Sequence, residues 1–260
     1  MNKKSKSVVI ALIVLLTLVS TAVLISCGTG ESSSGPLPPI KIGYSEYPYP
    51  PLHYYANDEL IGFDIELARL AANIMGYEPE FIPINWLENA AILESGEVDM
   101  LWGGLERASL DESIVAFTAP YLQSNIILLM NDDRDYNAFE DLQGLDICAL
   151  NFTPAFHYMN VYGRDVIKSQ RSYTPPEYEE LLDALSSGEF DCLVTDTSFA
   201  SFFLGINGDE GYRMSDVLIG SNYAVGVRAG DTETLDALQD ALNELSESGV
   251  IAELAERWIR

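Results

Sequence analysis

Cysteine, histidine and basic residues are all scarce in this sequence of 260 residues. Its three cysteines are too few for a disulfide scaffold, and none stands in a paired zinc-binding spacing. The two histidines, His53 and His157, leave little material for a histidine-rich metal site. Fourteen basic residues stand against forty acidic ones, and the resulting net charge of −26 repels polyanions. We therefore expect no metal, no cofactor and no nucleic-acid partner.

Apolar residues, by contrast, are plentiful. They make up 48% of the chain and are joined by fourteen tyrosines, which excludes disorder for most of its length. The length suffices for one large domain or two ordinary ones.

The N-terminus has the pattern of an export signal. Lys3, Lys4 and Lys6 precede an apolar run over residues 8–25, which is long enough to be mistaken for a membrane span. The run ends in Leu-Ile-Ser-Cys, which resembles the bacterial lipoprotein box. That resemblance implies a signal peptide over residues 1–27, with Cys27 lipidated as the new N-terminus. An uncleaved anchor helix is the alternative, and both place the rest of the chain outside the cytoplasmic membrane.

Residues 28–39 are rich in glycine, serine and proline and lack apolar periodicity, so they predict a flexible tether. We expect folding to start near Ile40.

Strands and helices alternate in the folded part. Apolar patterns predict strands at 40–43, 79–84, 98–102, 145–150 and 190–195. Helices are expected at 64–75, 87–94 and 176–185, then from 231 to 249 and over a last amphipathic turn or two. This alternation predicts parallel βαβ units in open, mostly parallel α/β sheets flanked by helices.

A short repeat suggests two related lobes. Leu-Glu-Ser-Gly-Glu-Val-Asp at 93–99 and Leu-Ser-Ser-Gly-Glu-Phe-Asp at 185–191 each pass from a helix end, through glycine, into a strand. Two α/β lobes predict a cleft between them, where small-molecule sites concentrate.

Several motifs, in order, resemble one family. The segment Gly-Phe-Asp-Ile-Glu-Leu-Ala at 62–68 resembles the signature of the extracellular solute-binding proteins that serve polar amino-acid ABC importers. The other matching segments are Pro50-Pro51, Trp86, residues 96–99, Phe117–Tyr121, Asp141–Gly144, residues 188–191, Asp196, Gly249 and Trp258.

This resemblance implies a two-lobed type II periplasmic binding fold. Lobe one would comprise residues 40–124 plus 222–260, and lobe two residues 125–221. The crossings near 122–125 and 221–223 would form the hinge. It also implies a monomeric receptor that delivers a small ligand to a permease and its ATPase.

The resemblance further assigns roles at the ligand site. Tyr49 and Trp86 fall where two aromatic rings sandwich the ligand, although core packing would also explain Trp86. Asp196 matches the acid that receives the ligand's ammonium group, with an ordinary helix cap as the alternative. Thr153 matches a hydroxyl that meets the ligand's carboxylate, and Phe152 stands where glycine is usual.

The segment from Gly103 to Asp111, with Gly104 among its candidate site residues, departs from the family. Many relatives have serine or threonine at the position of Glu106 and a carboxylate-clamping arginine at that of Asp111, whereas both are acidic here. Burying a ligand carboxylate beside them without a cation would cost several kcal/mol. Arg107 could replace the clamp, or the ligand could be an amine held by Glu106, Asp196 and Glu46. Alternatively, the turn is remodelled and the acids face solvent.

The remaining expectations concern chemistry. Cys148 and Cys192 fall on strands that could be neighbours, so either buried thiols or a disulfide is expected. Glu106 and Asp111 are paired carboxylates, but no nucleophile or phosphate-binding loop accompanies them. We therefore predict a lipid-anchored receptor for an amino acid or amine, with no catalytic residue. A ligand-sensing module for another membrane protein and a dehydratase-like enzyme on the same fold are the alternatives.

Overall fold

The computed structural model describes residues 36–163, 169–173 and 178–259. Residues from Pro38 onward form a compact unit. The predicted signal peptide, the lipidation site Cys27 and the tether up to residue 35 lie outside the described residues. Within them, no helix is long and apolar enough to cross a membrane.

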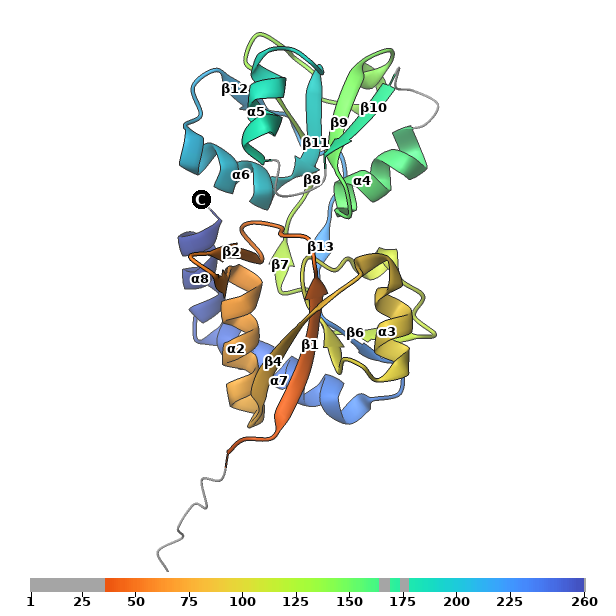
Figure 1. The fold of residues 1–260 in the computed structure, drawn as a ribbon, viewed down its shortest axis with the longest axis vertical. Coiled ribbons are helices and arrows are strands. Elements are labelled where there is room, and N and C mark those ends of the chain that lie inside the picture. Colours follow the sequence, from red (N-terminus) through yellow and green to blue (C-terminus); the bar gives the residue numbers. More distant parts are fainter. Residues whose placement is uncertain (1–35, 164–168, 174–177, 260) are drawn as a thin grey trace, which may run out of the picture. The chain divides into compact units, whose positions relative to one another are not determined.

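The first sheet has five strands in the order β4-β1-β5-β14-β6 (Figure 1). Its strands are β1 (Pro39–Ser45), β4 (Glu78–Ile84), β5 (Met100–Leu101), β6 (Val115–Phe117) and β14 (Gly226–Arg228). Strand β1 pairs in parallel with both β4 and β5, whereas β14 runs antiparallel to β5 and β6. A small hairpin of β2 (Tyr54–Ala56) and β3 (Glu59–Ile61) follows β1 in the chain.

Four helices accompany this sheet: α2 (Phe63–Met75), α3 (Asn89–Ser95), α7 (Thr232–Glu247) and α8 (Val250–Trp258). Helix α2 buries an apolar stripe of helical spacing and packs against α7 and α8. It ends at Gly76, whose φ of 82° is left-handed and therefore favours glycine.

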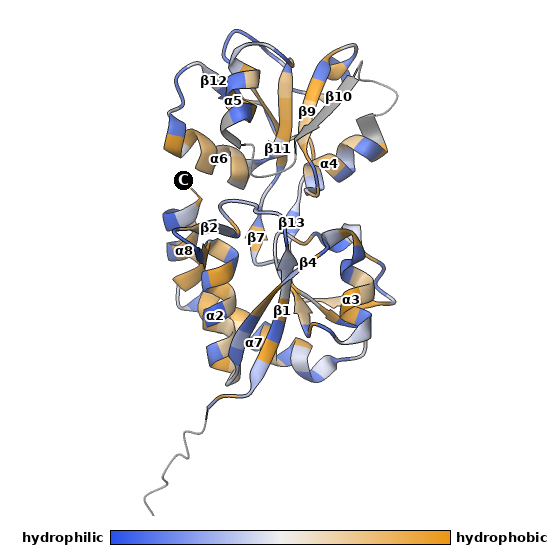
Figure 2. Cartoon of the chain, in the orientation of Figure 1, coloured by the Kyte–Doolittle hydropathy of each residue, from blue (hydrophilic) through white to orange (hydrophobic). Residues whose placement is uncertain are grey.

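The second sheet has the order β10-β9-β11-β8-β12. Its strands are β8 (Ile126–Asn131), β9 (Asp146–Leu150), β10 (Ser169–Tyr173), β11 (Cys192–Asp196) and β12 (Tyr212–Met214). The helical elements around it are η3 (Phe139–Leu142), α4 (Pro154–Tyr158), the π-helical η4 (Met159–Gly163), α5 (Tyr178–Ser186) and α6 (Thr197–Asn207). Every residue of β11 is buried, and apolar residues dominate β9 and β11 (Figure 2), as expected of strands covered on both faces.

The repeated segment has the same structural role in both sheets. In the first, the backbone N–H of Lys41 donates to Asp99 Oδ2 at 2.9 Å, and the Asp99 N–H donates to the Lys41 carbonyl at 2.8 Å. In the second, the N–H of Asp146 donates to Asp191 Oδ2 at 2.9 Å, and the Asp191 N–H donates back at 2.7 Å. Each aspartate thus bonds the start of one strand to the strand that pairs with it in parallel, β5 to β1 and β11 to β9, which gives the repeat a physical reason.

Two short strands lie where the chain leaves the first sheet and where it returns. They are β7 (Leu122–Gln123) and β13 (Asn222–Tyr223), which pair antiparallel. The N–H of Ser124 donates to the carbonyl of Ser221 at 3.1 Å and extends this pairing.

Each sheet is more mixed than the alternating pattern predicts, with two parallel and two antiparallel pairings. The antiparallel strands β6, β8, β12 and β14 are absent from the sequence prediction. Strand β5 is shorter than the predicted 98–102. The predicted helix at 87–94 is divided into a 3-10 turn, η1 (Trp86–Glu88), and α3, because the Asn85 side chain accepts the Leu87 N–H and starts a separate turn.

Cys148 and Cys192 are buried on the neighbouring strands β9 and β11, but they do not form a disulfide with each other. The register explains this, because Cys192 stands opposite Ile147 and Cys148 stands opposite Leu193. Neighbours in register point to the same face of a sheet and successive residues alternate. The two thiols therefore lie on opposite faces, and they belong to different apolar clusters.

Candidate functional site

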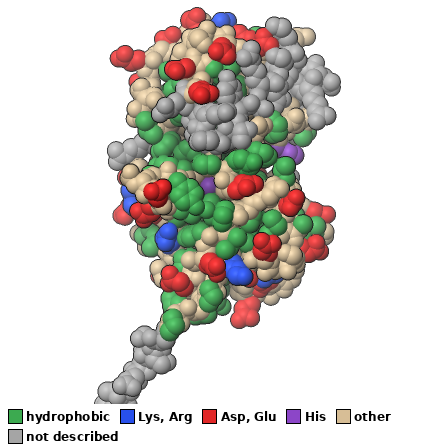
Figure 3. Space-filling view, viewed as in Figure 1, with side chains coloured by type: hydrophobic (Ala, Val, Ile, Leu, Met, Phe, Trp, Pro, Cys, Tyr) green, Lys and Arg blue, Asp and Glu red, His purple; other side chains and the backbone are tan. Residues whose placement is uncertain are grey.

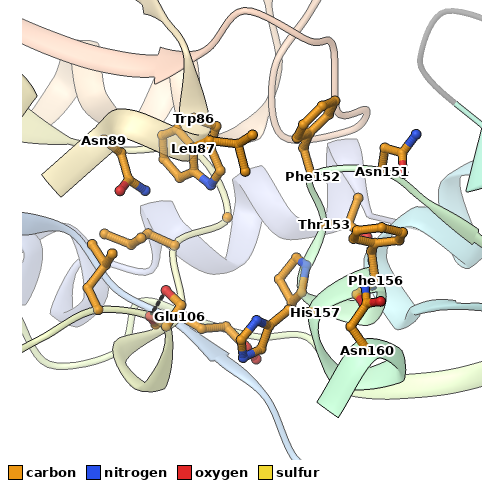
Figure 4. Close-up of a pocket in the computed structure, with 15 residues that line it drawn as sticks. Trp86, Leu87, Asn89, Glu106, Asn151, Phe152, Thr153, Phe156, His157 and Asn160 are labelled. Carbon is orange, nitrogen blue, oxygen red and sulfur yellow. Dashed lines mark hydrogen bonds between the residues drawn. The ribbon is translucent and has the colours of Figure 1, made fainter. Parts of the chain in front are cut away.

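A pocket of about 500 Å³ is lined by segments that follow strands of both sheets. It lies beyond the carboxyl ends of β4, β5 and β9, the edge at which open α/β sheets present their ligands. Figure 4 shows the side chains that line it, from Trp86 and Glu106 on one side to Phe152 and Asn160 on the other. The described lining residues are Trp86, Leu87, Asn89, Gly104, Leu105, Glu106, Ser109, Leu110, Asn151, Phe152, Thr153, Pro154, Phe156, His157 and Asn160.

Trp86 reaches the pocket from the end of β4. It begins the turn η1, which Asn85 caps by accepting the Leu87 N–H at 3.2 Å. The indole is half-buried and also packs on an apolar cluster of the first sheet, so it has both a packing role and an open face.

Glu106 is the one acidic side chain among the described residues that line this pocket. The residue is only 4% exposed, and its Oε1 accepts a hydrogen bond from the Ser221 hydroxyl. Its own carbonyl accepts bonds from the Ser109 N–H and hydroxyl, which hold the turn in place. Burial raises the pKa of Glu106 to about 7; a hydrogen bond to Tyr158 opposes this shift, and the nearby charge of Asp196 adds to it.

The other charged residues of this segment do not line the pocket. Arg107 is exposed, and its Nε pairs with Glu112 Oε1 at 2.8 Å. Asp111 is also exposed, and its Oδ1 accepts the Ser113 N–H at 2.8 Å. Arg107 therefore does not point into the pocket, so it does not replace the missing clamp in this structure. Asp111 faces solvent, as the remodelled turn would require, but Glu106 faces the pocket.

Glu46 lies outside the pocket as well. It is exposed just after β1, and it borders a separate small cavity beside Tyr44 and Tyr55.

Asp196 is completely buried and caps helix α6. Its Oδ1 accepts the N–H groups of Ser198 and Phe199 at 3.0 and 3.1 Å. The hydroxyls of Ser124, at 2.6 Å, and Ser198 bond to the same oxygen. Asp196 does not appear among the described residues that line the pocket, and the bonds it makes here are those of a helix cap.

Tyr49 is turned toward Asp196 rather than toward the pocket. Its hydroxyl donates to Asp196 Oδ2, and its ring stacks on Phe199 with centroids 6.2 Å apart. The residue is 6% exposed and borders only a small cavity beside the pocket. The structure thus brings Tyr49 and Asp196 to each other, and leaves Trp86 as the predicted ring at the main pocket.

Thr153 caps helix α4 at the pocket wall. Its hydroxyl donates to the Leu150 carbonyl at 2.8 Å and accepts the Phe156 N–H at 3.3 Å. Phe152, just before it, has a left-handed φ of 65°, a conformation that glycine adopts without strain. This agrees with the glycine that the family resemblance implies at this position. The Phe152 ring stacks on Tyr47 with centroids 4.5 Å apart and planes within 6°.

Sequence reasoning missed the wall that α4 and η4 provide. Phe156, His157 and Asn160 line the pocket at the 3-4 spacing of one helix face. Thr153 followed by Pro154 is a helix-start signal that could have located this helix. Asn89, at the start of α3, and Asn151, after β9, were also missed, because single amides carry no pattern.

A model of the bacterial extracellular solute-binding proteins, family 3, matches residues 40–260. The chain belongs to this family. The protein is 23% identical over 258 residues to the arginine-binding extracellular protein ArtP of Bacillus subtilis (strain 168), a match that covers 95% of this chain and 96% of ArtP. The resemblance drawn from the motif series is therefore confirmed.

Solved structures confirm the fold. A crystal structure of an ABC uptake transporter substrate-binding protein from Streptococcus pneumoniae with bound histidine matches with a TM-score of 0.73 and 24% identity, covering 85% of this chain and 92% of that one. The ancestral amino acid-binding protein AncCDT-1, a precursor of cyclohexadienyl dehydratase, matches with a TM-score of 0.72 and 22% identity, covering 85% of this chain and 96% of that one. The protein thus has the predicted two-lobed type II periplasmic binding fold.

Acidic side chains are spread over the face of the protein shown in Figure 3, and few basic ones interrupt them. Over the part of the chain that the structure describes, no group of three or more histidine, cysteine or acidic residues is placed to hold a metal ion. The pocket itself combines aromatic rings, amides and one buried carboxylate. That combination is suited to holding a small polar molecule with N–H donors.

Proposed function

We propose that the protein is an extracytoplasmic receptor that binds a small polar nitrogenous solute, an amino acid or an amine, and delivers it to an ABC importer. The observation that carries the proposal is the pocket of about 500 Å³, whose walls come from segments of both sheets. A volume of this size suits a metabolite, and walls from two lobes can enclose it almost completely.

Lobe one would comprise residues 40–124 plus 222–260 and lobe two residues 125–221, with the hinge at β7 and β13. Only these two short strands carry the chain between the sheets in this scheme. A two-strand hinge permits the lobes to close over the solute, which excludes water and strengthens every polar contact inside.

Four predicted site residues would contact the solute. Trp86 would offer a ring face, Thr153 a hydroxyl at a helix start, Gly104 a backbone surface and Glu106 a negative charge. Support for this assignment is that all four line the same pocket. Tyr49 and Asp196 would shape the neighbouring wall instead.

The receptor would be a monomer anchored by a lipid on Cys27, with residues 28–39 as its tether. A tethered receptor stays close to the permease and ATPase it serves while remaining free to reorient. Incubation with radiolabelled palmitate, comparing the wild-type chain with Cys27→Ala, tests the anchor. Label on both chains would remove Cys27 as the lipid site.

Calorimetry of the full chain in detergent against amino acids, their amides and polyamines tests the binding function. We expect saturable binding of one solute class and at least a tenfold loss in Trp86→Ala. Ile206→Ala, which removes an exposed side chain away from the pocket, should leave affinity unchanged. A folded chain that binds nothing in this set would refute the receptor function.

Two further readouts separate the alternatives. Cells without the protein should lose uptake of the solute, whereas a sensing module would alter a response and leave uptake intact. A dehydratase-like enzyme would convert prephenate or arogenate, whereas incubation of this protein with either compound should give no product, because the proposed site binds its solute without changing it.

A further inference from the structure

We propose that the pocket selects an organic cation that carries no carboxylate, such as a primary amine or a guanidine, with Glu106 as its counter-ion. This inference depends on the proposed function, because it takes the pocket as the solute site and names the class of solute.

The charge inventory of the pocket is the first argument. Among the described lining residues there is no lysine or arginine, and Glu106 is the single carboxylate. The nearest arginine in the same segment, Arg107, is 63% exposed and paired with Glu112. His157 is the only basic side chain among the described lining residues. A solute carboxylate would therefore lie beside a like charge with no permanent cation to offset it, which is unfavourable in a desolvated pocket.

The setting of Glu106 is the second argument. The Ser109 hydroxyl donates to the Glu106 carbonyl, and the Ser221 hydroxyl donates to one oxygen of the Glu106 carboxylate. These bonds orient the carboxylate before any solute binds. Asp196 lies close enough to add to the negative potential at Glu106. A bound cation would relieve this repulsion, whereas a bound anion would increase it.

The walls around Glu106 are the third argument. Trp86, Phe152 and Phe156 place three aromatic residues around the same space (Figure 4). Ring faces attract ammonium and guanidinium groups and contribute nothing comparable to a carboxylate. Asparagine side chains at the wall can accept the remaining N–H groups of such a cation.

Asp196 does not serve as the counter-ion in this arrangement. Its two oxygens already accept bonds from two backbone N–H groups and from the hydroxyls of Ser124, Ser198 and Tyr49. A solute ammonium would have to displace the Tyr49 hydroxyl to reach it. The cation is therefore received by Glu106.

Matched ligand pairs test the proposal on the wild-type full chain. Agmatine and arginine differ only in the carboxylate, as do cadaverine and lysine. We expect calorimetry to show at least a tenfold tighter dissociation constant for the decarboxylated member of a pair. Equal or tighter binding of arginine or lysine would overturn the proposal and leave the receptor function standing. Tight binding of a neutral amino acid, without binding of either pair, would also overturn the proposal while the receptor function still stands. Binding of no solute at all would refute both.

A variant pair then tests Glu106 itself. Glu106→Gln keeps the shape and removes the charge, and should weaken amine binding at least tenfold. Asp111→Asn removes an exposed carboxylate from the same segment and should leave affinity within twofold. Thermal unfolding checks that both variants are folded. Undiminished amine binding by folded Glu106→Gln would exclude Glu106 as the counter-ion, and the ligand pairs decide the solute class even if that variant does not fold.

Discussion

The hydroxyl of Tyr49 donates a hydrogen bond to Oδ2 of Asp196. This bond joins a loop after β1 to the end of β11, where Asp196 caps helix α6. Both residues are buried, so each satisfies a polar group that water cannot reach. Burial, with the nearby charge of Asp196, also raises the pKa of Tyr49 well above its usual value, which keeps the hydroxyl protonated as the donor.

Removal of this hydroxyl should destabilise the protein. Tyr49→Phe leaves a carboxylate oxygen of Asp196 without its donor, and we expect a loss of about 1–3 kcal/mol in the free energy of unfolding measured in urea. Tyr47→Phe, which keeps the ring stacked on Phe152, should change it by less than about 0.5 kcal/mol. A loss of the same size in both variants would show that the Tyr49–Asp196 bond is not the cause.

The buried Asp64 should make stability depend on pH. Burial raises its pKa to about 7, and the nearby polar groups of Tyr121 and Trp102 and the hydrogen bond from the Gly104 N–H oppose this shift. The folded protein therefore holds a proton on Asp64 that the unfolded chain releases, and stability falls as pH rises through the window between about 4 and 7. Urea unfolding at pH 5 and pH 8 should show that Asp64→Asn reduces this fall by an amount on the order of 2–4 kcal/mol.

Glu253→Gln removes an exposed acid on α8 and should leave that pH profile unchanged. A wild-type profile that matches the Asp64→Asn profile over the same window would contradict the assignment.

The two repeats should make equivalent contributions to stability. Asp99 and Asp191 bond to backbone N–H groups, and each also pairs with an arginine, Arg228 at 3.4 Å and Arg134 at 3.8 Å. We expect Asp99→Ala and Asp191→Ala each to lower the free energy of unfolding, measured in urea, by about 1–2 kcal/mol. The costs should add in the double variant, because the aspartates belong to different sheets.

Glu97→Ala, at an exposed acid two residues before Asp99, serves as the control and should be near neutral. If one of the two variants left the free energy of unfolding unchanged while the other lowered it by the expected amount, the two aspartates would not be equivalent.

Amine binding should strengthen as pH rises. Glu106 has a pKa of about 7, so its carboxylate is mostly protonated at pH 6 and mostly charged at pH 8. The groups that face it are Asp196, Tyr158 and Tyr223, and His157 lines the same pocket. Agmatine keeps its charge throughout, so its affinity by calorimetry should rise roughly five- to tenfold between these pH values.

Glu106→Gln should abolish this rise, whereas His157→Asn should keep most of it. If the slope disappears in His157→Asn instead, the histidine and not the glutamate is the titrating group.

Local pattern was sufficient for some of the longer elements, although it missed helix α6 and strand β8. The helix expected at 64–75 is α2, because apolar residues of helical spacing end at a glycine that can adopt a left-handed conformation. The strand expected at 79–84 agrees with β4. Strands β6 and β14, of three residues each, carry no usable periodicity, since they are defined by their partners in the sheet and not by their own residues.

The candidate site was predictable only in part. Trp86 and Thr153, which the family resemblance placed at the ligand site, line one pocket together with Glu106, whose direction the sequence left open. Phe156 and Asn160 went unnoticed because their helix was not expected. Cys148 and Cys192 could not be resolved from their positions, since a shift of one residue in register decides whether two thiols share a face of a sheet.

Family membership, the acidic balance and the absence of an arginine at position 111 could all be read along the chain. Which acid faces the pocket could not, because burial depends on what packs against a side chain from elsewhere. Ser221 beside β13 holds Glu106 inward, Glu112 holds Arg107 outward, and Tyr49 covers Asp196. Two contacts between residues more than a hundred positions apart, Ser221 with Glu106 and Tyr49 with Asp196, together with the local Arg107–Glu112 pair, thus decide which of several similar carboxylates faces the pocket.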